Sequence, residues 1–213
     1  MGTTRTPGIQ QLWAWLKRTL DLHSVLDVGC GEGHSTKYWR SLGCEVLGIE
    51  GSPFAVRDSV IPEAVRVHDF TTGPFKASRS YDAVWCCEVV EHIEEQFVSN
   101  LLDTFAAGRV IVMTHAVPGQ AGHHHVNCRP SGYWVRLFEQ RGYHLDYRLT
   151  RQARNLAHSY FCKTGMVFIR GRSWLPSAVA LQLLTFEWFP RRVWRHIRGR
   201  GVSSFWSTLR KRN

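Results

Sequence analysis

The chain has 213 residues, of which 44% are hydrophobic and 21% are charged. These values exclude a disordered chain and fit one domain of ordinary size with its own core. No uncharged apolar run is as long as a membrane-spanning helix, which needs about 18 residues. Residues 1–22 also lack the long apolar stretch of a secretory signal. Six cysteines without paired Cys-x-x-Cys spacing indicate free thiols, so we expect a cytoplasmic protein.

The net charge of +10 is concentrated toward the C-terminal end of the sequence. Residues 1–170 carry 18 lysines and arginines against 16 acids, whereas residues 171–213 carry 9 against the single acid Glu187. We therefore divide the chain into a domain at 1–170 and a basic, aromatic-rich extension at 171–213. The near-neutral domain argues against polyanion binding over the whole fold.

Apolar periodicity predicts a helix at 9–22 and, after it, strands that alternate with helices. The expected strands are 24–28, 45–49, 64–67, 81–87, 109–113, 143–149 and 165–170, and the expected helices include 35–42, 94–107 and 131–141. This alternation is typical of an α/β fold with a parallel sheet covered on both faces. Ligands of such sheets bind outside the carboxyl ends of the strands, so the residues that follow each strand are candidates for function.

A glycine-rich turn follows the first expected strand, with the sequence Asp27-Val28-Gly29-Cys30-Gly31-Glu32-Gly33. Glycines at alternate positions allow a tight turn and a close approach of the backbone to a ligand. The next helix presents free N–H groups at its start. Glu50 ends the second strand, where a carboxylate can accept hydrogen bonds from the two ribose hydroxyls of a nucleoside cofactor.

The spacing Gly-x-Gly-x-Gly differs from the Gly-x-Gly-x-x-Gly of dinucleotide-binding folds. With Asp27 two residues ahead, it closely resembles motif I of the class I S-adenosylmethionine (SAM)-dependent methyltransferases, and the resemblance covers roughly residues 24–170. It implies a Rossmann-like fold with a mostly parallel seven-stranded sheet flanked by helices.

The resemblance also implies the SAM contacts. Asp27 would lie near the methionine end, Glu50 would hold the ribose, and Asp69 would accept from the adenine amine, although a cap or turn role suits Asp69 nearly as well. The residues that we expect to bind SAM are Asp27, Gly29, Cys30, Gly31, Gly33, Glu50, Gly51, Asp69, Phe70 and Glu88.

An acid–histidine segment, Glu88-Val89-Val90-Glu91-His92, follows the fourth strand. If the chain turns helical at Glu88, then Glu88, Glu91 and His92 share one face. Two carboxylates and an imidazole can ligate a divalent metal, and one of them can act as a general base. A histidine triplet at 123–125 follows the fifth strand, and we prefer His125 as the additional ligand.

The segment resembles those of two metal-dependent methyltransferase groups. The small-RNA 2′-O-methyltransferases use a Glu-x-x-Glu-His motif and a later histidine to bind a divalent ion that engages ribose hydroxyls. The ubiquinone-pathway O-methyltransferases carry a similar segment and act at membranes. The resemblance implies Mg²⁺ or Zn²⁺ held by Glu88, Glu91, His92 and His125. Two alternatives stay open: proton transfer without a metal, with His92, Glu88 and His125 as the catalytic candidates, or local packing of His92.

The extension combines an apolar stretch at 174–189 with arginine clusters and further aromatic residues. This composition suits an anionic membrane surface, packing on the domain or a partner, or nucleic acid, in that order, and we assign the membrane contact to residues 172–213. The predicted function is methyl transfer from SAM to oxygen of a small, glycan or lipid-linked acceptor. RNA ribose methylation and a catalytically silent SAM-binding or partner-binding module are the alternatives, and the oligomeric state stays open.

Overall fold

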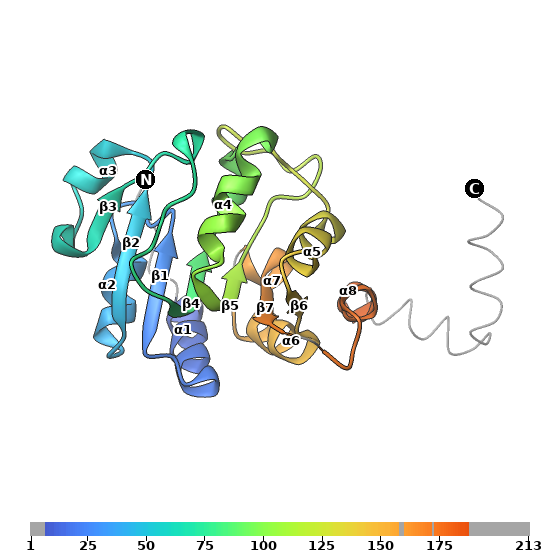
Figure 1. Cartoon of the computed structure of the whole chain (residues 1–213). Helices are drawn as coiled ribbons and strands as arrows, with labels where there is room; N and C mark the ends of the chain where they lie inside the picture. Colours follow the sequence, from blue (N-terminus) through green and yellow to red (C-terminus); the bar gives the residue numbers. More distant parts are fainter. Residues whose placement is uncertain (1–6, 158–159, 172, 188–213) are drawn as a thin grey trace, which may run out of the picture.

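The computed structural model describes residues 7–157, 160–171 and 173–187, and it arranges them as a seven-stranded sheet with helices on both faces (Figure 1). The strand order is β3-β2-β1-β4-β5-β7-β6, and β7 runs antiparallel to both of its neighbours while the other pairs are parallel. The Rossmann-like methyltransferase fold and its mostly parallel sheet are thus confirmed. The strands are β1 (Ser24–Val28), β2 (Glu45–Glu50), β3 (Val65–Val67), β4 (Tyr81–Cys86), β5 (Gly108–Met113), β6 (Tyr143–Leu145) and β7 (Met166–Arg170).

The helices agree less closely with the sequence-based expectations than the strands do. The α-helices are α1 (Pro7–Leu20), α2 (His34–Ser41), α3 (Pro53–Arg57), α4 (Val98–Phe105), α5 (Ser131–Glu139), α6 (Tyr147–Leu156), α7 (Phe161–Thr164) and α8 (Ser177–Glu187). Short 3₁₀ turns are η1 (Pro62–Ala64), η2 (Phe70–Thr72), η3 (Val90–His92) and η4 (Glu95–Phe97). Helices α3, α6 and α7 have no counterpart among the elements expected by residue range.

The expected strand at 143–149 is wrong beyond Leu145. Asp146 Oδ1 accepts a hydrogen bond from the Leu149 N–H (2.9 Å) and caps α6. A cap of this kind satisfies a free N–H in the first turn and lets the helix begin at once. The expected helix at 94–107 likewise starts late, because η4 precedes α4.

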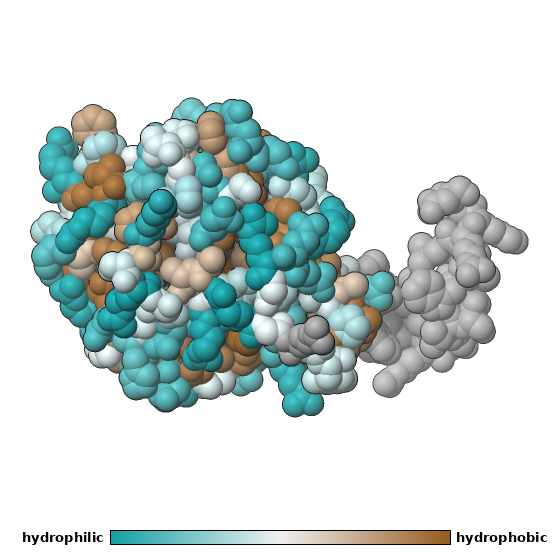
Figure 2. Space-filling view, viewed as in Figure 1, coloured by the Kyte–Doolittle hydropathy of each residue, from teal (hydrophilic) through white to brown (hydrophobic). Residues whose placement is uncertain are grey.

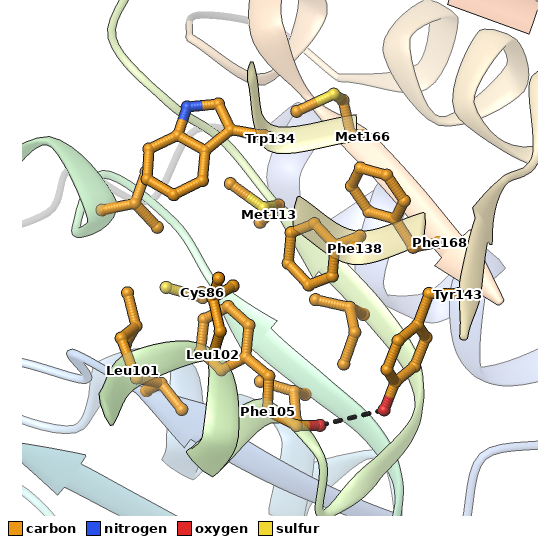
Figure 3. Packing of buried hydrophobic residues seen from close by; sticks show 14 of the residues in the cluster. Cys86, Leu101, Leu102, Phe105, Met113, Trp134, Phe138, Tyr143, Met166 and Phe168 are labelled. Atoms are coloured by element: carbon orange, nitrogen blue, oxygen red, sulfur yellow. Dashed lines mark hydrogen bonds between the residues drawn. The ribbon is translucent and has the colours of Figure 1, made fainter. Parts of the chain in front are cut away.

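Helices α4, α5 and α8 pack on one face of the sheet, around the aromatic residues of Figure 3. Trp134 and Phe138 of α5 are fully buried, and the Phe138 ring stacks on Phe168 of β7 with 4.3 Å between centroids. The Tyr143 hydroxyl donates to the Phe105 carbonyl (3.2 Å). This contact joins the edge strand β6 to the end of α4 within the core on this face of the sheet.

The opposite face is covered by α1, α2, α6 and α7, and its centre is aromatic. Trp13 of α1 lies 5.6 Å from Trp85 of β4 and 6.1 Å from Trp39 of α2, measured between ring centroids. Phe161 of α7 stacks on Trp85 with 5.7 Å between ring centroids. Each aromatic pair contributes about 0.5–1.5 kcal/mol beyond the burial of its area, so α1 and α7 are tied to the sheet through Trp85.

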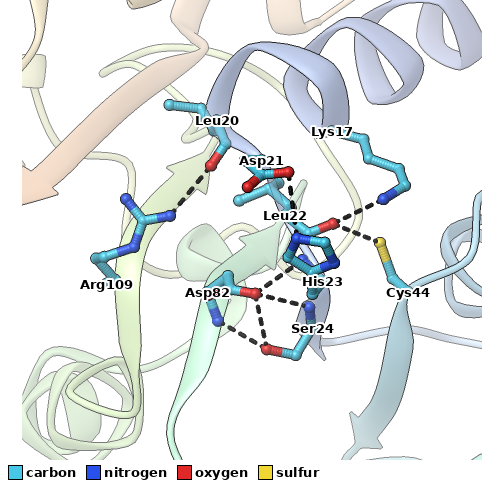
Figure 4. Close-up of polar contacts among 9 residues, drawn as sticks. All are labelled: Lys17, Leu20, Asp21, Leu22, His23, Ser24, Cys44, Asp82 and Arg109. Atoms are coloured by element: carbon cyan, nitrogen blue, oxygen red, sulfur yellow. Dashed lines mark hydrogen bonds and ion pairs between the residues drawn. The ribbon is translucent and has the colours of Figure 1, made fainter.

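One carboxylate joins the amino ends of β1 and β4 (Figure 4). Asp82 Oδ2 accepts hydrogen bonds from the His23 N–H (2.8 Å), the Ser24 N–H (2.9 Å) and the Ser24 hydroxyl (3.2 Å). Partial burial raises the pKa of Asp82, but these hydrogen bonds outweigh it and hold the pKa below its ordinary value. The ionised carboxylate therefore fixes the start of the central strand pair.

Helix α8 lies within the extension expected from residue 171 onward, and it packs on α5, α6 and β6. Ala180 and Leu184 are buried in the same cluster as α5. Within the described ranges, no helix combines the length and apolarity needed to cross a bilayer. Most of the expected membrane-binding segment, residues 188–213, lies outside the described residues, and the division at residue 170 stays a prediction.

We expect Asp82→Ala to lower the free energy of unfolding by about 1.5–3 kcal/mol, because two backbone N–H groups lose a charged acceptor. Urea denaturation at pH 7 measures this change. Asp58→Ala is the matched control, since Asp58 pairs only with Arg57 at the surface (2.8 Å) and should cost at most about 1 kcal/mol. Equal losses in the two variants would contradict a special role for Asp82.

Candidate active site

The glycine-rich turn adopts backbone conformations that favour glycine. Gly29, Gly31 and Gly33 have φ angles of 70°, 56° and 81°, in the left-handed region that side chains disfavour. A Cβ atom at Gly29 would lie 2.3 Å from Cγ2 of Val89, whereas one at Gly31 would meet no atom within 4 Å. The turn is therefore packed against the segment after β4 on one side, and Gly31 faces open space.

Glu50 lies beside this turn, at the end of β2. Its Oε2 accepts a hydrogen bond from the Gly31 N–H (2.8 Å), and its Oε1 accepts one from the Ser52 N–H (2.9 Å). Each oxygen keeps a further acceptor position for a ligand hydroxyl. The structure thus brings the predicted glycine turn and the predicted ribose acid together, while the ribose contact itself stays a prediction.

Asp27 is buried at the end of β1 and holds the start of α2. Its Oδ2 accepts hydrogen bonds from the hydroxyls of Ser35 (2.6 Å) and Thr36 (2.7 Å). Burial raises the pKa of Asp27 to about 6, although both hydrogen bonds oppose the shift. Asp27 therefore has a structural role, because its carboxylate links the end of β1 to the start of α2. Its contact with SAM stays a separate prediction.

Three other predicted cofactor residues have contacts within the protein. Asp69 Oδ1 accepts from the Thr71 N–H (2.8 Å), which caps η2 and lowers the pKa of Asp69. Phe70 is buried among the core residues under α4, and Cys30 packs near Val65, where burial raises the pKa of its thiol. The cap role that the sequence left open for Asp69 is present. The SAM contacts of these residues, and of the exposed Gly51, stay predictions.

The expectation of a helical turn starting at Glu88 is wrong. Glu88 has a φ angle of 57°, in the left-handed region that few non-glycine residues adopt, and the 3₁₀ turn begins only at Val90. Glu88 therefore turns toward β5. The Thr114 hydroxyl donates to Glu88 Oε1 (2.7 Å) and accepts from the Glu88 N–H (2.8 Å).

Glu91, His92 and His125 come together as the sequence predicts, each offering one ligand atom, and these atoms lie within 4.8 Å of one another. Glu88 is not part of this group of three, which speaks against it as a fourth ligand. The Glu91 carboxylate is fully buried, and neither of its oxygens has a hydrogen-bond partner. Burial raises the pKa of Glu91 to about 7. An unpaired buried carboxylate is costly, so this group fits a site for a proton or a cation.

The two histidines of this group are oriented by contacts with the loop before α5. The His92 Nδ1–H donates to the His124 carbonyl (3.1 Å), so Nε2 of His92 carries the free lone pair. The His125 ring stands nearly edge-on to His92, with 5.1 Å between centroids. A Cβ at Gly122 would lie 2.2 Å from the His125 ring. Only glycine at position 122 therefore leaves room for His125 in this place.

Backbone hydrogen bonds clamp the same loop to the segment after β4. The Glu91 carbonyl accepts from the N–H groups of Val126 (2.9 Å) and Asn127 (3.0 Å). The Asn127 side chain is buried, and its Oδ1 accepts from Arg129 Nε (2.9 Å), while its Nδ2 has no partner. Glu91 and Asn127, whose backbones are hydrogen-bonded, thus each have a buried side-chain polar atom without a partner. Such atoms indicate a polar site rather than a packed core.

Sequence reasoning missed Thr114 and the Arg129 contacts. Arg129 pairs with Glu95 (3.0 Å) and lies over the ring of Tyr133, whose hydroxyl donates to Glu95 (2.7 Å). Thr114 had a usable signal, because it is a polar residue directly after a buried strand at the sheet edge that binds ligands. The pairing of Arg129 with Glu95 had none, since it joins segments far apart in the sequence.

Comparison with known proteins supports a methyltransferase. Residues 26–107 match the family model described as a methyltransferase domain. The tocopherol O-methyltransferase of Arabidopsis thaliana is 35% identical over 106 residues, which cover 44% of this chain and 30% of that protein. The ubiquinone biosynthesis O-methyltransferase of Schizosaccharomyces pombe is 29% identical over 101 residues, which cover 42% and 37%. The match thus spans about a third of the length of these relatives.

Solved structures share the fold at low sequence identity. The methyltransferase domain of bacterial CtHen1-C superposes with a TM-score of 0.56 at 14% identity, covering 78% of this chain and all of that domain. The magnesium protoporphyrin IX methyltransferase of Synechocystis, solved with bound SAH, also gives 0.56, at 16% identity over 78% of this chain and 84% of its own. The family match at residues 26–107 and the shared fold agree with the resemblance to the class I SAM-dependent methyltransferases.

We expect Asp27→Asn to change how stability depends on pH. Because the folded-state pKa of Asp27 lies near 6, above the ordinary value of 3.8, folding favours its protonated form. This contribution is complete below pH 4 and is lost as the pH rises to 6, at a cost of about 3 kcal/mol.

Denaturation of both proteins without SAM, from pH 4 to 7, measures the effect. The parent should lose stability relative to Asp27→Asn as the pH rises, since the amide cannot ionise. A difference that stays constant over this range would show that Asp27 has an ordinary pKa.

Proposed function

We propose that the chain transfers the methyl group of SAM to a hydroxyl oxygen of a small or lipid-linked acceptor, and that Glu91, His92 and His125 hold a divalent cation beside that hydroxyl. The observation that carries the proposal is the buried, unpaired Glu91 carboxylate, grouped within 4.8 Å with two imidazoles. The names of the two curated relatives, both O-methyltransferases, support oxygen as the acceptor atom.

The charge at this end of the sheet suits SAM better than a dinucleotide. Carboxylates follow three neighbouring strands: Asp27 and Glu50 end β1 and β2, and Glu88 and Glu91 follow β4. SAM carries a sulfonium and an ammonium group, whose positive charges are attracted to such an edge, whereas a pyrophosphate would be repelled. When bound, SAM supplies an electrophilic methyl group, with its ribose on Glu50 and its backbone contacts at Gly31.

One carboxylate and two imidazoles are ligand types that bind divalent cations, and imidazole ligands favour Zn²⁺ over Mg²⁺. When bound, the cation would lower the pKa of an acceptor hydroxyl and fix its position. The His124 carbonyl holds the His92 ring with Nε2 free for this purpose. The same nitrogen can accept the hydroxyl proton as a general base, so the His92 geometry serves either version of the reaction.

Replacing Glu50 by alanine should raise the Kd for SAM at least tenfold, because losing a charged hydrogen-bond partner costs about 1.5–3 kcal/mol. Isothermal titration calorimetry measures the affinity. Glu63→Ala is the control, since Glu63 is an exposed acid paired with Arg40. Unchanged affinity in Glu50→Ala, with the control also unchanged, would refute the ribose assignment.

Cation binding can be measured on the protein after EDTA treatment, by titration with Zn²⁺, Mn²⁺ and Mg²⁺. We expect Glu91→Gln and His125→Ala each to weaken binding about a hundredfold or more. Gly122→Ala keeps every ligand but displaces His125, and we expect it to weaken binding about tenfold, as outer-shell changes do. His144→Ala is the control, because His144 of β6 contacts only the Gly171 carbonyl (3.0 Å). Equal affinity in all four variants would remove the proposed site.

The acceptor class requires a transfer assay. Radiolabelled SAM is incubated with the protein and a lysate, with and without EDTA, and the products are separated into organic, RNA, protein and small-molecule fractions. Label in the organic or small-molecule fraction, lost with EDTA, supports the proposal. Label in short RNA would replace it with ribose methylation, which the Glu91, His92 and His125 group also suits. SAM binding without any label would favour a silent binding module.

A further inference from the structure

Helix α8 is apolar on every side. Its sequence, Ser177-Ala-Val-Ala-Leu-Gln-Leu-Leu-Thr-Phe-Glu187, distributes alanine, valine and leucine around the helix, interrupted by the polar residues Gln182 and Thr185. A helix with this composition is expected to be buried on all sides. Helix α6 differs, because arginines and other polar residues interrupt its sequence. The apolar residues of α8 are thus spread more widely than a single buried stripe requires.

The described residues cover one side of α8 only. Ala180 and Leu184 are buried, whereas Val179 and Leu183 are each 40% exposed. Val179 and Leu183 are four residues apart, so they adjoin on the helix surface. Trp174, just before the helix, is 84% exposed. Apolar side chains of α8 reach the surface at this end of the molecule in Figure 2. We call Trp174, Val179 and Leu183 the α8 strip.

The chain that follows α8 indicates what covers this strip. Residues 188–213 contain eight lysines and arginines and no acid. Arg136 of α5 and Arg148 of α6 are exposed on the two helices that contact α8. A protein partner that buries the apolar strip would not account for the many basic residues. An RNA would account for the basic residues but not for the apolar strip. Apolar and aromatic residues beside basic ones match the surface of an anionic bilayer.

We propose that the α8 strip docks this protein on an anionic lipid bilayer, with Trp174, Val179 and Leu183 in the headgroup region. The net positive charge of the C-terminal sequence adds an electrostatic attraction to the anionic lipid. A Cβ atom at Gly132 would lie 3.8 Å from Leu181 Cδ2, so α8 adjoins the start of α5. The loop that carries His125 ends directly before α5. If the function proposed above holds, this placement brings the acceptor side close to a lipid-linked substrate. The docking itself does not depend on that function.

Vesicle flotation of the full chain tests the proposal. The probes are vesicles of phosphatidylcholine alone and of phosphatidylcholine with phosphatidylglycerol. We expect flotation with the anionic vesicles, weakened at high salt because the charges are then screened, and little with the neutral ones. The double variant Val179→Glu, Leu183→Glu should lower the partition coefficient at least about tenfold. Gln182→Glu adds a charge to an exposed polar position of the same helix and is the control.

Several outcomes would overturn the proposal. The first is no flotation with either vesicle, and the second is equal flotation of the double variant and of Gln182→Glu. A third is a dimer in light scattering that the double variant abolishes, which would assign the strip to a second copy. A fourth is tight binding to RNA that the double variant weakens. Because flotation needs neither SAM nor a cation, failure of the proposed methyl transfer would leave this result unchanged.

Discussion

Two hydrogen bonds to one carbonyl oxygen hold the candidate site together. The Glu91 carbonyl accepts from Val126 and Asn127, and this clamp places the histidine loop over the segment after β4. The two hydrogen bonds hold the loop close to the segment after β4, and Gly122 leaves space for the His125 ring. His125 therefore lies beside His92. The side chains supply the chemical groups of the site. Backbone hydrogen bonds between segments about 35 residues apart bring these side chains together.

The arrangement costs free energy that the rest of the fold must offset. The Glu91 carboxylate is buried without a hydrogen-bond partner, and Glu88 adopts a left-handed backbone conformation. Such features persist only where the surrounding structure determines them. The surroundings here are two dense cores, with Trp85 packed on one face of the sheet and Phe138 on the other. Rigid strands between these cores hold the strand ends at which the acids lie. The unpaired carboxylate and the left-handed residue thus both lie at the carboxyl edge, where the candidate site is.

Strands and the glycine turn were predictable because their signals are local: apolar runs identify β1, β4 and β5, and the spacing of glycines identifies the turn. The meeting of Glu91, His92 and His125 was predictable in part, since each follows a strand that ends at the same edge. The orientation of Glu88 was not predictable, because its N–H and its carboxylate both bond to the hydroxyl of Thr114, which follows β5 and is distant in the sequence. The end of β6 at Leu145 was missed because a cap at Asp146 overrides the apolar pattern.

The antiparallel strand β7 has a consequence for synthesis on the ribosome. It lies between β5 and β6, so β5 has an unpaired edge until residues 166–170 have been made. β6 emerges earlier but has no strand to join until then. During this interval a buried apolar strand is open to pairing with other chains, which is the hazard of an exposed sheet edge. The nascent chain therefore depends on a late segment to close its sheet, and truncation before β7 would leave an aggregation-prone product rather than a smaller domain.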